Sequence, residues 1–264
     1  MRGLARLLLC EFRKLRRTRL PLLLGVAAAF FPLFGALSVL GGSARPDSVY
    51  GSTLGTLTAF GLPFLLPFLT GLLATRLFFW ESECDTLKLL RTVPVRTGPL
   101  AVAKLGALLL LNLAVTALAT LGCLLAALGI SRVLLADAAS LCGLALLAGL
   151  LQTLAALPLV LLVVWVRGSS LLSLLAALVY SIVNGFGCLQ VLVQMGSAGV
   201  PPEQLPPGRQ LLFCLPGALI QRCLFAGMSG SPYAVAPALL AAVMIGMSAL
   251  FGMGIVWAYD RWER

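Results

Sequence analysis

Six stretches of the chain, each longer than twenty residues, contain no Asp, Glu, Lys or Arg. A helix rises about 1.5 Å per residue, so about twenty apolar residues cross the roughly 30 Å hydrocarbon core of a bilayer. A charged side chain at mid-bilayer costs roughly 2.5–3.5 kcal/mol, so each charge-free stretch predicts a membrane crossing. The six stretches are Leu20–Ala44, Ser48–Thr75, Leu105–Ser131, Ala138–Val166, Gly168–Pro202 and Cys223–Tyr259.

We therefore predict an all-α polytopic membrane protein in which residues 1–264 form a single transmembrane domain. The composition agrees, since 11% of the residues are charged, against roughly 25% in an ordinary soluble domain. Pro32 should kink the first helix, and Pro63 and Pro67 should leave the second bent or partly unwound. The carbonyls that these prolines free must then be satisfied by neighbouring groups. The predicted crossings are 20–40, 53–79, 100–128, 139–166, 171–195 and 233–259.

The cations are divided unequally between the two sides of this topology. Fifteen of the 19 Lys and Arg lie in the two termini and in the loops after the second and fourth crossings. The positive-inside bias places this set, and hence both termini, in the cytoplasm. The net charge of +10 fits anionic lipid headgroups better than nucleic acid, because no aromatic residues are interleaved with the cations. The remaining cations, on the outer side, are Arg45, Arg132, Arg209 and Arg222.

The cytoplasmic segment 1–19 carries an amphipathic pattern. Its apolar residues recur at helical spacing, which predicts an interfacial helix over 3–17 that lies on the inner leaflet. Glu11 is the only acid among seven cations, and Lys14 is a candidate partner for it. The alternative is a positive-inside anchor with no further role. The apolar stripe is Leu4, Leu8, Phe12 and Leu15, and Lys14, Arg16 and Arg17 are the candidate cations of this elbow helix.

The extracellular segment 196–232 is rich in proline, and its apolar part, 211–225, is too short to span a bilayer. We expect a re-entrant or interfacial pair of short helices there, broken at Pro216. Cys214 and Cys223 in this segment either form a disulfide or remain two free thiols.

Amide side chains are the main polar groups within the predicted crossings. Such amides more often form helix–helix hydrogen bonds than bind a substrate. Three of them lie close together along the fifth crossing and are a candidate polar cleft: Asn184, Gln190 and Gln194.

Several kinds of chemistry have no residues to support them. The chain has no histidine and no C-x-x-C pair, and none of its three lysines follows a glycine as a Walker A motif requires. We therefore predict no catalytic, metal-binding or cofactor-binding residue. An ATP-driven role would need another subunit to bind the nucleotide.

The cytoplasmic loop 80–99 has the charge pattern of a short helix. A membrane subunit would need such a protruding helix to receive motion from a soluble partner. Glu81, Glu83 and Asp85 open it, Lys88 and Arg91 close it, and this polarity complements the helix macrodipole. Pro94 then ends the predicted helix. A solvated loop helix without a partner is the alternative.

Two motifs carry a family resemblance. The loop contains Thr86-Leu87, Leu89-Leu90, Pro94-Val95 and Arg96, followed by Ala103-Lys104-Leu105, and the N-terminus contains Glu11 followed by Lys14-Leu15-Arg16-Arg17-Thr18. Both resemble permeases of ABC-2-type exporters, in particular those of lantibiotic-immunity transporters. Asp85 stands where many members have glycine.

This resemblance implies a six-helix permease that pairs with a second permease, identical or different, and with cytoplasmic ABC ATPases that bind ATP and Mg²⁺. It further implies a bacterial plasma membrane and an amphiphilic substrate, such as a lantibiotic-type peptide. The residues implied in ATPase coupling are Glu81, Glu83, Thr86, Leu87, Leu90, Pro94 and Arg96. The alternatives are a membrane-embedded lipid-modifying enzyme and a non-transporting scaffold or sensor subunit.

Overall fold

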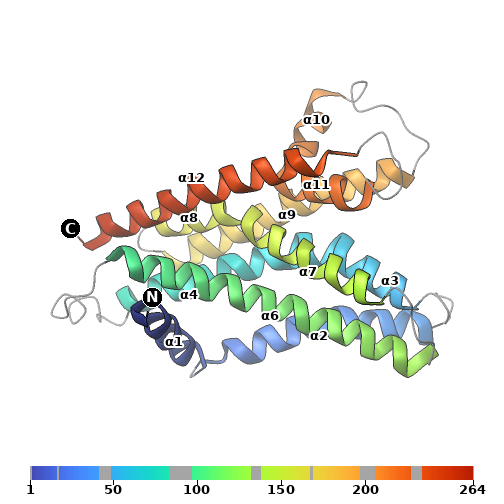
Figure 1. The fold of residues 1–264 in the computed structure, drawn as a ribbon, viewed down its shortest axis with the longest axis horizontal. Coiled ribbons are helices and arrows are strands. Elements are labelled where there is room, and N and C mark those ends of the chain that lie inside the picture. Colours follow the sequence, from blue (N-terminus) through green and yellow to red (C-terminus); the bar gives the residue numbers. More distant parts are fainter. Residues whose placement is uncertain are drawn as a thin grey trace.

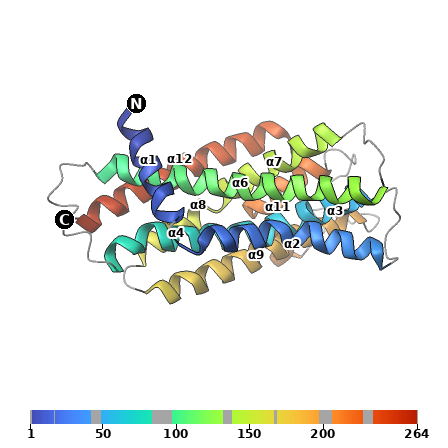
Figure 2. The same ribbon diagram turned by 90° about the horizontal axis from the view of Figure 1, so that it is seen from below.

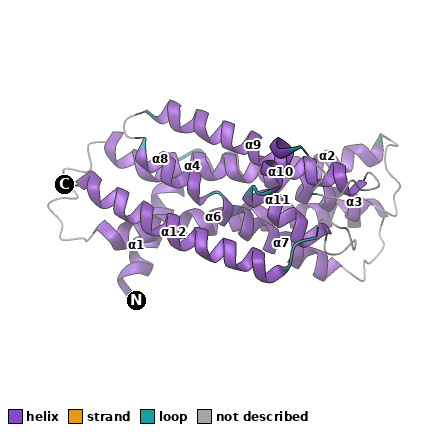
Figure 3. Cartoon of the chain, turned by 90° about the horizontal axis from the view of Figure 1, so that it is seen from above, coloured by secondary structure: helices purple, strands orange, loops and turns teal. Residues whose placement is uncertain are grey.

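The computed structural model describes residues 2–16, 18–41, 49–83, 97–131, 138–166, 169–196, 206–226 and 234–263. Within these ranges the regular structure is entirely helical (Figure 3). The long helices lie side by side along the longest axis of the molecule (Figure 1). Six are long and apolar enough to cross a membrane, which confirms the predicted fold class. These spans are Leu20–Leu37, Thr53–Phe79, Gly98–Gly129, Ala138–Trp165, Ser170–Gln194 and Pro237–Arg261.

The first helix, α1 (Arg2–Arg16), and the end of the last, α12 (Pro237–Glu263), lie at the same end of the bundle (Figure 1). We call this the terminal end and the opposite one the distal end. Helix α2 (Leu20–Leu40) runs from the terminal end toward the distal end and remains helical through Pro32. Helix α1 crosses the bundle at a steep angle instead of following it (Figure 2), as an elbow would.

The second crossing consists of three helical segments. Helix α3 (Val49–Thr56) leads into the π-helix η2 (Leu57–Leu65), and α4 (Leu66–Glu83) completes the crossing. Pro63 lies inside η2 and Pro67 in the first turn of α4. The predicted irregularity of the second crossing is thus confirmed, and it takes the form of a π-helix, which is wound more widely than an α-helix. Helix α4 continues four residues beyond the predicted end of this crossing at residue 79.

The fourth crossing is divided, which the sequence analysis did not predict. After α6 (Thr97–Ser131), helix α7 (Ala138–Ala155) ends before Ala156, and α8 (Leu157–Trp165) begins after it, with Pro158 in its first turn. A proline at this position removes a backbone donor. The Tyr180 hydroxyl donates to the Ala155 carbonyl at 2.5 Å, and Tyr180 belongs to the fifth crossing, α9 (Ser170–Gly196).

A helical hairpin lies at the distal end. It contains α10 (Pro207–Phe213), α11 (Pro216–Gln221) and the π-helical turn η4 (Arg222–Ala226). Helix α11 packs against α7, α9 and α12, and α10 packs against α9. The short helices predicted on either side of Pro216 are therefore present. The predicted start of the sixth crossing at residue 233 lies outside the described residues.

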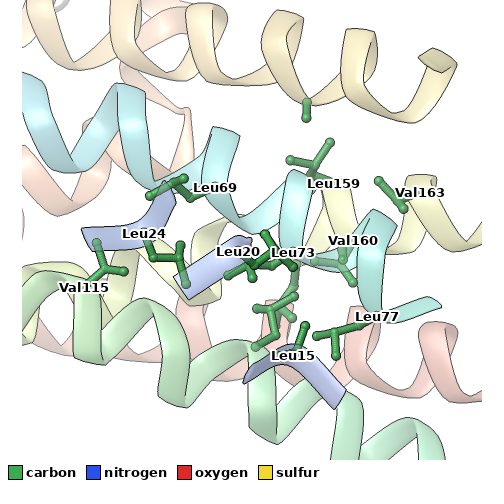
Figure 4. Close-up of a cluster of buried hydrophobic side chains, with 14 of the residues drawn as sticks. Leu15, Leu20, Leu24, Leu69, Leu73, Leu77, Val115, Leu159, Val160 and Val163 are labelled. Carbon is green, nitrogen blue, oxygen red and sulfur yellow. The ribbon is translucent and has the colours of Figure 1, made fainter. Parts of the chain in front are cut away.

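The buried core at the terminal half joins α1, α2, α4, α6 and α8 (Figure 4). Between helices in a bilayer, close packing supplies the attraction that hydrophobic burial supplies in water. Helices α4 and α9 approach each other closely, since a Cβ added to Gly71 would lie 2.3 Å from the Ala177 Cβ. The labelled core residues are Leu15, Leu20, Leu24, Leu69, Leu73, Leu77, Val115, Leu159, Val160 and Val163.

Candidate functional site

The candidate coupling loop leaves the bundle at the end of α4 and returns at the start of α6, both at the terminal end (Figure 1). Glu81 and Glu83 lie in the last turns of α4, so they continue the second crossing instead of beginning a separate loop helix. The other predicted coupling residues, Thr86, Leu87, Leu90, Pro94 and Arg96, lie outside the described residues. The described part of this region is therefore its base, where α4 and α6 meet.

The base of the loop contains a fully buried lysine. Lys104, two turns into α6, has 0% relative exposure, and its ammonium group donates a hydrogen bond to the main-chain carbonyl of Leu77 on α4. A buried ammonium ion needs such compensation, because desolvation strongly disfavours the charge. Helix α4 thus supplies an acceptor directly below the loop.

Two aromatic rings lie close to this lysine. The Lys104 Nζ atom lies 5.6 Å from the centroid of Phe78 on α4 and 5.8 Å from that of Tyr259 on α12. These separations permit cation–π attraction. The rings also contact one another edge to face, with centroids 5.5 Å apart. Lys104 therefore fastens the two helices that flank the loop to each other and to α12.

In the sequence, Lys104 stands out only as part of the Ala103-Lys104-Leu105 motif, and this role was not predicted. A local signal was present: Ala101, Ala107 and Leu108 lie three or four residues from Lys104, on the same face of the predicted helix. A single cation on an otherwise apolar helical face points to a specific partner. Its partners, Leu77, Phe78 and Tyr259, carry no such signal.

The elbow helix is attached beside this cluster. The Glu11 side chain is 4% exposed and forms a salt bridge of 3.0 Å with Lys14, which confirms the predicted pairing. These two residues line a small cavity of about 20 Å³ together with Arg76 and Leu77 of α4. Arg16 is exposed, and Arg17 lies outside the described residues. The buried face of α1 thus reaches the same turn of α4 as Lys104.

The three amides of the predicted polar cleft are not equivalent. Asn184 is buried, and its amide group bonds to the Pro63 carbonyl and to the main-chain N–H of Gly217. Gln190 and Gln194 are half-buried on α9. At about 100° per residue, Asn184 faces roughly 120° away from Gln190, six residues later. The structure therefore groups Gln190 with Gln194, while Asn184 joins α9 to other elements.

Three further buried amides lie within the bundle. Asn112 donates to the Thr70 hydroxyl at 2.7 Å, a helix–helix hydrogen bond of the predicted kind. Gln221 donates to the Thr58 carbonyl, also at 2.7 Å. One polar atom of each of Asn112, Gln152 and Gln221 has no hydrogen-bond partner. These groups do not suggest a metal site, and the described residues contain no cluster of three His, Cys, Asp or Glu side chains.

The distal hairpin contains two free thiols, Cys214 and Cys223. Cys214 is exposed, whereas partial burial raises the pKa of the Cys223 thiol. Arg222, next to it, donates to the Phe213 carbonyl at 3.4 Å, and its guanidinium group lies 5.7 Å from the Phe213 ring. These contacts join the two halves of the hairpin.

Residues 7–184 match a family model described as "ABC-2 family transporter protein". The matched region begins in α1, includes the candidate coupling loop and Lys104, and ends within α9. No curated protein matches the chain.

Proposed function

The chain belongs to the ABC-2 family of transporter proteins, and from this premise we propose that it is the permease subunit of an ATP-driven exporter. Permeases of this family are membrane components without an ATPase site of their own and associate with an ABC ATPase. The absence of a Walker A lysine agrees with this division of labour. ATP and Mg²⁺ are then bound by the partner subunit.

We assign the terminal end to the cytoplasm of a bacterial cell. The support is the charge asymmetry, since most Lys and Arg lie in the segments that meet at this end. Helix α1 then lies at the inner leaflet, with its cations near lipid headgroups. The distal hairpin faces the cell exterior.

The observation that carries the coupling mechanism is the environment of Lys104. The loop between α4 and α6, with Glu81 and Glu83 at its start, would seat in a groove of the ATPase. Motion applied to the loop reaches α4 and α6 together, because Lys104 bonds across them. Tyr259 brings α12 into the same body. Three helices would therefore respond to one movement.

The substrate is an amphiphilic compound, and the resemblance favours a lantibiotic-type peptide that is removed from the membrane or the cell. A second permease, of the same or another sequence, would complete the pathway. Much of the surface of α12 is exposed and could contact this second permease. The exposed residues include Ala238, Ala242 and Gly246, which recur at four-residue spacing. Gln190 and Gln194 are candidate polar contacts of the pathway.

The test is reconstitution of the permease with its cognate ATPase in liposomes, followed by ATP-dependent movement of a fluorescent lantibiotic. Export that requires both subunits and stops with a catalytically inactive ATPase supports the proposal. Modification of phospholipid by the permease alone would support the lipid-modifying alternative. Normal ATPase assembly without movement of any amphiphile would support a scaffold or sensor.

A further inference from the structure

The two prolines of the second crossing each remove one backbone donor. A π-helix pairs each N–H with the carbonyl five residues earlier, so Pro63 in η2 leaves the Thr58 carbonyl without its helical donor. An α-helix uses a spacing of four, so Pro67 in α4 leaves the Pro63 carbonyl without one. Both carbonyls lie within the apolar part of the crossing, where an unsatisfied group is costly.

A side-chain amide from another element replaces each missing donor. Gln221, at the end of α11, donates through Nε2 to the Thr58 carbonyl at 2.7 Å. Asn184 on α9 donates through Nδ2 to the Pro63 carbonyl at 3.2 Å. Both side chains are almost fully buried, at 3% and 2% relative exposure. The two carbonyls that the prolines free are therefore the same two that the amides bind. This explains why these polar residues are inside the bundle.

The same amides fix the distal hairpin to the break. The Oδ1 atom of Asn184 accepts a hydrogen bond from the main-chain N–H of Gly217, at the start of α11, at 3.1 Å. A side chain at position 217 would prevent this contact, because an added Cβ would lie 2.4 Å from that oxygen. Helix α11 is therefore bonded to the break at its start through Asn184 and at its end through Gln221.

We infer that Asn184 and Gln221 are positioning residues that make the distal hairpin follow a hinge at Leu57–Leu65. The break can bend there without losing helical hydrogen bonds at Thr58 and Pro63, because these carbonyls bind side chains instead. Helix α4 leads from the break to the candidate coupling loop, so movement at the loop is transmitted to the hairpin through the two amides. The movement in this mechanism comes from the ATPase, so this part rests on the proposed function. The amide contacts are observed in the structure and do not depend on that function.

The first experiment tests the amide contacts without any transport assay. Gln221→Leu and Asn184→Leu should each lower the unfolding midpoint of the purified permease, by roughly 2–8 °C. Pro63→Ala returns an N–H to the break near Thr58 and should recover part of the loss in Gln221→Leu, but not in Asn184→Leu. Pro67→Ala returns an N–H near Pro63 and should recover part of the loss in Asn184→Leu, but not in Gln221→Leu.

The matched control is Gln152→Leu, since this amide on α7 is 2% exposed and its Nε2 atom has no partner. Neither proline substitution should change the midpoint difference that Gln152→Leu produces. The assignment of the two amides would be overturned if each proline substitution stabilised both leucine variants equally. It would also be overturned if neither proline substitution stabilised its own leucine variant.

The second experiment tests transmission with the native Cys214, which is exposed on the hairpin. The permease–ATPase complex, with Cys10→Ser, Cys84→Ser, Cys142→Ser and Cys223→Ser, is labelled by a maleimide in nanodiscs, with and without Mg-ATP and vanadate. Trapping should change the Cys214 labelling rate several-fold in this background and in Gln152→Leu. The change should be lost in Gln221→Leu and Asn184→Leu, although both variants hydrolyse ATP in the absence of vanadate.

The outcomes separate the two levels of the proposal. If trapping changes labelling equally in all variants, the hairpin moves without the amides and the inference is wrong. If trapping never changes labelling while the pairing-specific rescue holds, the contacts exist but do not transmit an ATPase stroke, which overturns the hinge and not the amide assignment. If the complex neither assembles nor hydrolyses ATP, the proposed function fails first.

Discussion

The ammonium group of Lys104 donates a hydrogen bond to the main-chain carbonyl of Leu77, across the two helices that flank the candidate coupling loop. The bond lies within the apolar core, and the rings of Phe78 and Tyr259 lie within 6 Å of the same nitrogen. A contact of this kind transmits force because it cannot exchange its partner for water. Its removal should affect coupling more than assembly.

Lys104→Met keeps the length of the side chain and removes the charge. We expect the variant to insert and to bind the ATPase, with a stability loss of about 1–3 kcal/mol and most of the ATP-dependent transport lost. Lys104→Arg should retain more transport, because it keeps a cationic donor. Arg19→Met, an exposed cation at the same end, is the control. Parallel losses of assembly and transport in Lys104→Met would indicate a purely structural role.

Charge reversal in the loop tests the contact with the ATPase. Glu83→Lys and Leu87→Asp should abolish transport while the amount of permease in the membrane stays normal, because the first reverses and the second buries a charge at the expected interface. Glu203→Lys, in the predicted extracellular segment 196–232, is the control for the charge change. Co-purification of the ATPase and transport are measured together. Normal transport in both loop variants would remove the loop from the coupling mechanism.

Local patterns were sufficient for the crossings and for the break in the second one. Long charge-free stretches predict spans whatever their neighbours, and Pro63 and Pro67 remove donors by their own chemistry. The replacement donors were not predictable, because Gln221 lies 163 residues from Thr58 and Asn184 lies 121 residues from Pro63. Pro158 is a local signal of the same kind for the division of the fourth crossing at Ala156, and this division was missed because the proline argument was not applied there.

The two residues of the Glu11–Lys14 ion pair in α1 should contribute unequally to stability, because only Glu11 is buried. Lys14→Ala leaves the Glu11 carboxylate, which is 4% exposed, without its cation, whereas Glu11→Gln removes the buried charge. The first should therefore destabilise the protein more than the second, because an unpaired buried charge costs more than a lost pair. Arg13→Ala, an exposed neighbour, is the control. Proteolysis of α1 in detergent, read with thermal unfolding, reports the order, and equal effects of Lys14→Ala and Arg13→Ala would contradict it.

The two thiols of the hairpin should differ in reactivity. The thiolate is the reactive form, and burial raises the pKa of the Cys223 thiol, so less thiolate is present at neutral pH. Cys214 is exposed, and a maleimide should label it first at pH 7. Labelling of Cys223 should accelerate as the pH rises toward its raised pKa, and denaturation should abolish the difference. Mass spectrometry distinguishes the sites, and a disulfide between them would contradict the structure.

The close approach of α4 and α9 predicts the effect of a single methyl group. Gly71→Ala would place a Cβ 2.3 Å from the Ala177 Cβ, so the two backbones must separate, at about 1–3 kcal/mol. Gly143→Ala is the matched control: it lies in α7 with no atom within 4 Å of the added Cβ. The control should be neutral or more stable by roughly 0.5–1 kcal/mol, because alanine favours the helix. Thermal unfolding of both purified variants checks this, and Ala177→Gly should restore stability to Gly71→Ala since it removes the opposing methyl group. A Gly71→Ala protein as stable as the Gly143→Ala protein would show that α4 and α9 do not pack this closely.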